Sequence, residues 1–136
     1  MAATVLDSYA LLAFLRGEDA DGEVRKLLER ASDRNQPLHM TEISYSEVKY
    51  IILRKEGRAR WVSIAAGLVV LPLEFHPITR VLADLAADFK AEYRISLADA
   101  FAAALANEKK AELVTGDPEF KPLENKIKIK WIGGSD

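Results

Sequence analysis

The sequence predicts an α/β domain in which a mostly parallel sheet is covered by helices on both faces. Short β-rich runs alternate with longer helical patterns along the chain, which is typical of βαβ units. The 136 residues are 49% hydrophobic and 29% charged, a composition that suits a single globular domain over residues 1–136 with a buried core. Prolines and glycines are scattered between periodic segments, so no interdomain linker is expected.

Five runs of the chain are predicted to be strands. They are short, and they are rich in β-branched or aliphatic residues. In chain order they are Thr4–Leu6, Leu38–Met40, Val69–Leu73, Glu112–Thr115 and Lys128–Ile132. Lys126, Lys128 and Lys130 alternate around the last run, which indicates a charged edge strand that discourages aggregation.

Helical patterns fill the segments between these strands. Apolar residues at i, i+3, i+4 spacing predict two amphipathic helices that pack on the sheet. The first stripe follows Asp21 and comprises Val24, Leu27, Leu28 and Ala31, and the second follows Pro77 and comprises Val81, Leu82, Leu85, Ala86 and Phe89. The alanine-rich run 100–106 predicts a further helix that can pack closely against its neighbours.

Three polar patterns mark the starts of helices. Ser44 with Glu47 three residues later has the form of a capping box, and Ser96 with Asp99 has nearly the same form before the alanine-rich run. Asp117, followed by a proline, predicts an N-cap that opens a short helix after the fourth strand. These patterns place Glu47 and Asp99 in the first turns of their helices.

Four acidic residues are expected at the same edge of the sheet. Asp7 ends the first strand and Asp117 follows the fourth, while Glu47 and Asp99 belong to helices that can begin at that edge. In open α/β sheets, ligands bind outside the carboxyl ends of the strands, where the strand order reverses. Taken singly, each acid is explained equally well as an N-cap or as an acid favoured by a helix N-terminus.

A convergence of these acids would require a cation. Carboxylates in one apolar-walled crevice repel one another, and this repulsion raises their pKa values or destabilises the fold unless a positive charge lies among them. Mg²⁺ and Mn²⁺ prefer carboxylate and water oxygens, and Mg²⁺ commonly bridges carboxylates to a substrate phosphate. The pattern therefore predicts a magnesium or manganese site.

Composition excludes several other classes of function. The chain has a formal net charge of -2, no cysteine and two histidines, which argues against binding nucleic acid by bulk charge and excludes thiolate zinc sites and cysteine nucleophiles. His76, just before Pro77, is expected to be a loop or capping residue. The start of the chain is a poor signal peptide, and the most apolar later stretch, Trp61–Leu73, is too short to span a membrane. A cytoplasmic protein is expected.

Four ordered pieces of the chain resemble PIN-domain ribonucleases. They are residues 5–12 (VLDSYALL), 46–48 (SEV), 95–104 (ISLADAFAAA) and 113–120 (LVTGDPEF). Their spacing and the length of the chain resemble the VapC type, the toxin half of a toxin-antitoxin pair. The resemblance covers essentially the whole chain and implies a three-layer α/β/α fold with strand order 3-2-1-4-5.

The resemblance also implies roles for individual residues. Asp7 and Asp99 would be metal ligands, and Glu47 and Asp117 would complete the acidic pocket. Three auxiliary candidates are Thr115 and Ser8, which would orient a carboxylate or water, and Glu119, the second acid of the last piece. Each of the three is equally well explained as an ordinary turn or first-turn residue.

The activity and partners follow from the same resemblance. Similar proteins cleave RNA with Mg²⁺ or Mn²⁺, form homodimers, and pair with a small antitoxin that covers the active-site cleft. The densest basic cluster, which could bind RNA or could be a solvated helix end, comprises Arg54, Lys55, Arg58 and Arg60. A candidate protein-protein interface comprises Tyr45, Tyr50, Ile51, Ile52 and Trp61. Ordinary core packing also explains most of these residues.

Three other classes of function share parts of this pattern. A PIN-like module that serves RNA processing or partner binding without a toxin role has the same four acids, so the sequence does not distinguish it. A receiver-like phosphoacceptor domain is disfavoured because the predicted third strand is followed by no aspartate. A haloacid-dehalogenase-type phosphatase is disfavoured because Tyr9 occupies the place of its second aspartate.

Overall fold

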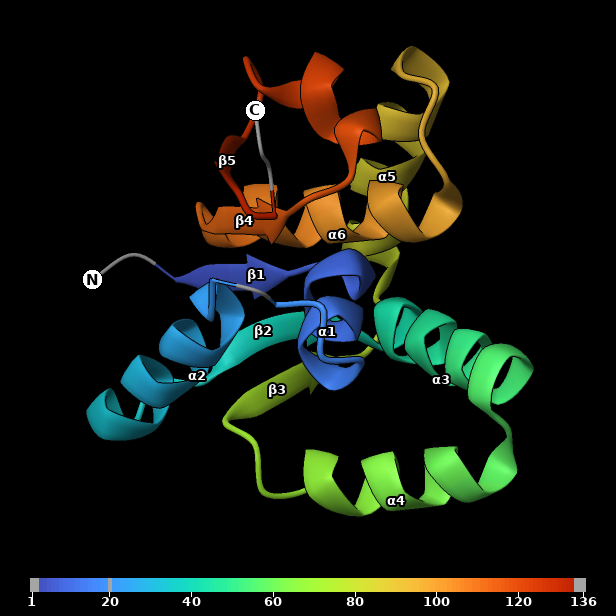
Figure 1. The fold of residues 1–136 in the computed structure, drawn as a ribbon. Helices are drawn as coiled ribbons and strands as arrows, with labels where there is room; N and C mark the ends of the chain where they lie inside the picture. Colours follow the sequence, from blue (N-terminus) through green and yellow to red (C-terminus); the bar gives the residue numbers. More distant parts are fainter. Residues whose placement is uncertain (1–2, 20, 134–136) are drawn as a thin grey trace.

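The computed structural model describes residues 3–19 and 21–133, and these residues form a parallel sheet between layers of helices (Figure 1). The strands are β1 (Thr4–Leu6), β2 (Leu38–Thr41), β3 (Leu73–His76), β4 (Glu112–Thr115) and β5 (Lys128–Trp131). The helices are α1 (Ser8–Leu15), α2 (Glu23–Arg34), α3 (Glu42–Glu56), α4 (Arg58–Leu68), α5 (Arg80–Glu92) and α6 (Leu97–Lys109), and a 3-10 helix, η1 (Pro118–Leu123), follows β4.

The sheet has the order β3-β2-β1-β4-β5, and every neighbouring pair is parallel. Figure 1 shows the strands stacked from β5 at the top to β3 at the bottom. This confirms both the predicted α/β class and the strand order that the resemblance implied. The order reverses between β1 and β4, so the carboxyl ends of these two strands form the expected binding edge. Lys128 lies on β5, which is an edge strand as the alternating lysines predicted.

Alternation along the strands divides the core into two clusters. Val5 and Leu113 point to the α5 and α6 face, whereas Leu6 and Val114 point to the face covered by α1 to α4. Residues 100–106 of α6 are all nearly fully buried, because a helix whose side chains are mostly alanine can fit between the sheet and α5. The prediction of a closely packed helix is confirmed.

The amphipathic stripe of α2 packs on the sheet as predicted. Its residues Val24, Leu28 and Ala31 are buried in the α1 to α4 cluster. The stripe of α5 is only partly correct, since Val81 is 57% exposed. The buried residues of α5 pack mainly against α6, so this helix forms an outer layer over α6 and does not lie directly on the sheet.

The predicted third strand, Val69–Leu73, is wrong. Val69 and Val70 are 84% and 82% exposed beyond the end of α4, and the strand is β3, Leu73–His76. In β3, Leu73 and Phe75 pack on the core while Glu74 and His76 face the other way. An alternating segment thus formed the strand, although the adjacent run of valines is more apolar. His76 consequently lies in a strand and not in a loop or cap.

The predicted start of α3 is also wrong. Its N-cap is Thr41, whose hydroxyl accepts a hydrogen bond from the Ser44 backbone N–H at 2.9 Å, so the helix begins at Glu42. Ser44 therefore lies in the first turn and does not cap it, and Glu47 lies in the second turn. The capping-box pattern at Ser44 and Glu47 gave the wrong helix start, because Thr41, the last residue of β2, is also a good capping residue.

Most of the residues in the candidate interface belong to the core. Ile52 and Trp61 are buried, and the ring of Tyr45 packs edge-on against Trp61 and Phe75. Tyr50, by contrast, is 44% exposed. Tyr45 and Trp61, which lie on α3 and α4, therefore stabilise the packing of these two helices. No helix in the described part of the chain is long and apolar enough to cross a membrane.

The turn after β4 leaves no space for a side chain at Gly116. A Cβ there would lie 2.8 Å from Tyr9 Cζ and 2.9 Å from the Ile132 carbonyl oxygen. Gly116→Ala is therefore expected to lower the free energy of unfolding by about 1–3 kcal/mol, as measured by denaturant titration. Gly67→Ala in α4 is the matched control, because its Cβ meets open space and should raise stability by up to about 1 kcal/mol. Equal stability of the Gly116 variant and the wild type would contradict the packing seen here.

Candidate metal centre

The four predicted acids converge at the edge where the strand order reverses. Asp7 follows β1 and is the N-cap of α1, and Asp117 follows the neighbouring β4 and is the N-cap of η1. Asp99 lies in the first turn of α6, and Glu47 enters from the second turn of α3. Two adjacent strands and two helices that begin at the same edge thus bring together residues that are far apart in the sequence.

Three of these acids, Glu47, Asp99 and Asp117, line a small pocket of about 270 Å³. Its lining comprises Ser8, Tyr9, Leu12, Glu47, Ile51, Ser96, Asp99, Asp117 and Glu119. Carboxylate oxygens of Asp99, Asp117 and Glu119 lie within 4.8 Å of one another. Asp7 and Thr115 do not line the pocket, because they are buried behind it at 1% and 0% exposure. Among the described residues, the lining has no lysine, arginine or histidine.

Both oxygens of Asp7 are held by the protein. Oδ1 accepts a hydrogen bond from the Ala10 backbone N–H at 2.8 Å, and Oδ2 accepts one from Thr115 Oγ1 at 2.5 Å. The same Thr115 oxygen accepts the Asp117 backbone N–H at 2.9 Å. Thr115 therefore fixes the position of one acid side chain and of the backbone that carries another.

The other acids also make hydrogen bonds that hold their side chains or their backbone in place. Ser8 Oγ donates a hydrogen bond to Glu47 Oε1, Ser96 Oγ accepts the Asp99 backbone N–H at 3.1 Å, and Asp117 Oδ1 accepts the Glu119 backbone N–H at 2.9 Å. Asp7 and Asp117 are therefore N-caps, as one of the two interpretations predicted. Oδ1 of each carboxylate serves the helix, whereas Oδ2 of Asp7 accepts the hydrogen bond from Thr115 and an oxygen of Asp117 lies near those of Asp99 and Glu119.

Burial and mutual repulsion disfavour the charged forms of two acids. Burial raises the pKa of Asp7 from 3.8 to about 7, with repulsion from Asp117 and Glu47 adding to it and the hydrogen bonds from Thr115 and Ala10 opposing it. Burial likewise raises the pKa of Asp99 to about 8, and repulsion from Asp117, Asp7 and Glu47 adds to it. At neutral pH, the pocket therefore binds either protons or a cation.

The donor set fits a hard dication. It consists of carboxylate and hydroxyl oxygens, which suit Mg²⁺ and Mn²⁺ and not softer metals. Asp99, Asp117 and Glu119 present oxygens close enough to share one ion, and Asp7 lies directly behind them. The sequence indicated Glu119 only as an auxiliary candidate, whereas its carboxylate lies close to those of Asp99 and Asp117. Tyr9 and Leu12 also line the pocket, because they lie one turn apart on α1. Neither was predicted from the sequence to be a site residue.

The four residues of the predicted basic cluster have different surroundings. Arg60 donates to Glu56 Oε1 at 3.2 Å and to the Leu15 carbonyl at 3.1 Å, and the guanidinium of Arg54 lies 5.2 Å from the centre of the Tyr50 ring. Lys55 lines a separate pocket of about 560 Å³ together with acidic residues that follow α1. Arg58 is exposed at the start of α4. RNA binding by these residues remains a prediction.

Loss of the Thr115 hydroxyl should weaken both the fold and the site. Thr115→Val keeps the shape of the side chain but removes the donor to Asp7 and the acceptor for Asp117, so we expect a loss of about 1–3 kcal/mol in the free energy of unfolding. Denaturant titration measures this loss. Thr4→Val on the neighbouring β1 makes the same chemical change and should shift stability by less than about 0.5 kcal/mol. Similar effects of the two substitutions would contradict the bridging role of Thr115.

Comparison with known proteins agrees with this fold. The PIN domain family model matches residues 4–126. Similar solved structures include VapBC2 from Rickettsia felis bound to a promoter DNA fragment, with a TM-score of 0.77, 16% identity and coverage of 96% of this chain and 98% of that chain. DNA-bound VapBC from Salmonella typhimurium has a TM-score of 0.75, 18% identity and coverage of 96% of this chain and 98% of that chain.

A third similar structure is VapC20 from Mycobacterium tuberculosis, described as a toxin that cleaves the sarcin-ricin loop, with a TM-score of 0.70, 18% identity and coverage of 88% of this chain and 94% of that chain. No match was found among curated protein sequences. The family match spans β1 to the residues just before β5 and includes all four acids. The chain belongs to the PIN domain family.

Proposed function

We propose that this protein is a Mg²⁺- or Mn²⁺-dependent endoribonuclease and the toxin component of a VapC-type toxin-antitoxin pair. The observation that carries the proposal is the convergence of four acids at one edge of the sheet. Glu47, Asp99 and Asp117 line a pocket that has no basic residue in its described lining, and Asp7 is near enough for Asp117 and Glu47 to raise its pKa. Nuclease activity is further supported by the family match and by the likeness to a toxin described as cleaving the sarcin-ricin loop.

The protein's own groups would bind and orient the reacting parts. Asp99, Asp117 and Glu119, with Asp7 behind them, would hold the ion, and Thr115 would keep the Asp7 carboxylate in place. When bound, a divalent ion supplies the positive charge that lowers the pKa of a coordinated water and stabilises charge on the scissile phosphate. Because the carboxylates alone would repel a phosphate, RNA enters the pocket only when their charge is neutralised.

The glutamate from α3 would have a different role from the aspartates. Glu47 is anchored by Ser8 and lines the pocket from α3. It could accept a proton from an attacking water without leaving its position, because Ser8 donates to only one of its two oxygens. No side chain need form a covalent bond to the RNA.

We further propose that a cognate antitoxin covers this pocket in the cytoplasm and that the toxin forms a homodimer. Two of the similar structures are toxin-antitoxin complexes bound to DNA. An arginine from the antitoxin could enter the pocket and replace the charge of the ion, because guanidinium pairs with carboxylates in a bidentate geometry. This would block metal binding and cleavage together.

The proposal is tested by incubating purified protein, freed of any co-purified partner, with single-stranded and structured RNA. Cleavage is expected with Mg²⁺ or Mn²⁺ and is expected to disappear on chelation. Asp7→Asn should abolish cleavage while the protein remains folded by circular dichroism. Cleavage at the wild-type rate by Asp7→Asn, or cleavage that persists in chelator, would show that the proposed centre is not catalytic.

A further inference from the structure

A second group of metal-ligand side chains lies outside the acidic pocket, on the β2 and β3 edge of the sheet. The register pairs His39 of β2 with Glu74 of β3, and Thr41 with His76. Glu74 and His76 are two residues apart on one strand and therefore point to the same face. His39 is also opposite Val5, which belongs to the α5 and α6 cluster, so all three side chains lie on that face.

The ligand atoms of this group are close together. His39 Nδ1 lies 2.8 Å from His76 Nε2, His76 Nε2 lies 3.4 Å from Glu74 Oε2, and His39 Nδ1 lies 4.0 Å from Glu74 Oε1. A tetrahedral zinc ion with ligands at 2.0–2.1 Å separates neighbouring ligand atoms by about 3.3 Å. The three observed separations, two of which end on different oxygens of the Glu74 carboxylate, bracket this value. One ligand atom from each residue lies within 4.8 Å of the other two, so small side-chain adjustments suffice to place the three residues around one ion.

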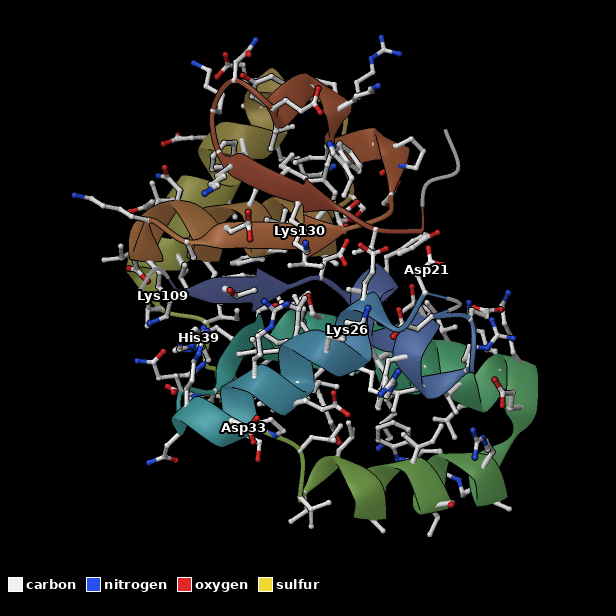
Figure 2. The ribbon with its side chains drawn as sticks, turned by 60° about the vertical axis from the view of Figure 1, so that its left-hand side comes forward. Asp21, Lys26, Asp33, His39, Lys109 and Lys130 are labelled. Atoms are coloured by element: carbon white, nitrogen blue, oxygen red, sulfur yellow. The ribbon has the colours of Figure 1, made fainter. Side chains whose placement is uncertain are left out.

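The surroundings of the group suit an open site. The imidazoles are 14% and 17% exposed, whereas Glu74 is 54% exposed, which leaves solvent access for a fourth ligand. Lys109, at the end of α6, is close enough to His39 to repel its protonated form. Figure 2 shows both labelled residues at the same margin of the molecule. Burial is the largest cause of the lowered pKa of His39, and it favours the neutral imidazole that a metal requires.

We propose that His39, Glu74 and His76 bind a transition-metal dication of the zinc class, with water in the fourth position. Two imidazole nitrogens and one carboxylate suit Zn²⁺, Co²⁺, Ni²⁺ or Cu²⁺ and give Mg²⁺ little advantage over water. The ion would tie the edge strand β3 to β2 and would thus stabilise the sheet margin. This site shares no residue with the acidic pocket and does not depend on the proposed ribonuclease activity.

In the metal-free protein, the same contact is a hydrogen bond between the two rings. One facing nitrogen must then carry a proton and the other must accept it. Metal binding requires lone pairs on both facing nitrogens; the accepting ring already provides one, and the donating ring provides the other when its proton moves to its opposite nitrogen. An experiment must therefore distinguish a metal site from a hydrogen bond between the two rings that has no metal affinity.

Nuclear magnetic resonance of the full chain offers a direct test, since the protein contains only two histidines. Titration of the metal-free protein with Zn²⁺ should shift the ring nitrogen signals of both histidines together and saturate at one ion per chain. Mg²⁺ should leave these signals unchanged. If the two rings fail to respond to Zn²⁺, or if only one of them responds, the proposed site does not exist.

Variants then assign the ligands with Co²⁺, whose visible absorption reports tetrahedral nitrogen ligation. We expect His76→Asn to abolish the signal and Glu74→Gln to weaken affinity by at least about tenfold. Glu74 is exposed, so its substitution spares the core. Glu92→Gln makes the same chemical change at the last residue of α5, and it should leave Co²⁺ binding intact. Asp99→Asn should also retain the signal, because the acidic pocket is a separate site. Unchanged Co²⁺ affinity in Glu74→Gln and His76→Asn would overturn the proposal.

Discussion

Replacing Asp99 with asparagine is expected to reduce metal-dependent RNA cleavage by more than about 100-fold, since changes even to the partners of metal ligands reduce activity by 10- to 100-fold. Asparagine has nearly the same shape as aspartate, so the loss would arise from charge. Asp99 is 6% exposed, and its oxygens lie near those of Asp117 and Glu119. Removal of its charge leaves too little negative potential to hold a dication. Initial cleavage rates at saturating Mn²⁺ measure the effect.

The same substitution should stabilise the metal-free protein. The neutral amide avoids the repulsion from Asp117 and Asp7 that raises the pKa of Asp99. Thermal unfolding at pH 8 in chelator should therefore show a higher Tm for Asp99→Asn than for wild type. Asp88→Asn on the exposed surface of α5 makes the same chemical change and should affect neither activity nor Tm. An active Asp99→Asn variant, or one destabilised in chelator, would contradict the assignment of Asp99 as a metal ligand.

The stability of the metal-free protein is expected to fall as pH rises from about 4 to 8. Asp7 and Asp99 have ordinary pKa values of 3.8 that burial raises to about 7 and about 8 in the folded state. Between these limits the folded protein holds protons that the unfolded chain has released, so the free energy of unfolding decreases with pH. The stabilisation is fully present below pH 3.8 and is lost above the folded pKa values. Denaturant titrations in chelator across this range measure the slope.

Asp99→Asn isolates the contribution of the site to this slope. The lowered pKa of His39 acts in the opposite direction, and comparison of variant and wild type cancels this contribution. The variant should show a shallower fall in stability with pH. Because a dication binds the deprotonated carboxylates, Mn²⁺ should raise Tm more at pH 8 than at pH 6 in wild type. Parallel pH profiles for the two proteins would show that the pocket acids do not control stability.

Local patterns were sufficient to predict most of the fold and all four acids. Strand ends and capping residues are local features, and in a parallel α/β sheet the carboxyl ends of strands lie at one edge. Asp7 and Asp117 were therefore predictable from their strands alone. The start of α3 was less predictable, because Thr41 and Ser44 are both suitable N-caps and only the register of β2 decides between them.

Contacts between distant residues could not be predicted in the same way. Thr115 and Asp7 are 108 residues apart, and their hydrogen bond depends on the pairing of β4 with β1. The second cluster was hidden by the misplaced third strand. With the strand at Val69–Leu73, His76 falls in a loop, whereas the alternation that begins at Leu73 places it beside His39. The run 69–73 is more apolar, but the core buries one face of the alternating segment, and this segment forms the strand.

Anomalous diffraction from a crystal soaked in Mn²⁺ would decide whether the converging acids form a metal centre. The expected result is a manganese peak among the carboxylates of Asp7, Asp99, Asp117 and Glu119, within ligand distance of at least two of them. The peak should disappear in crystals of Asp99→Asn. A pocket without manganese at saturating concentration, or manganese bound only elsewhere on the protein, would contradict the proposed centre and with it the ribonuclease mechanism.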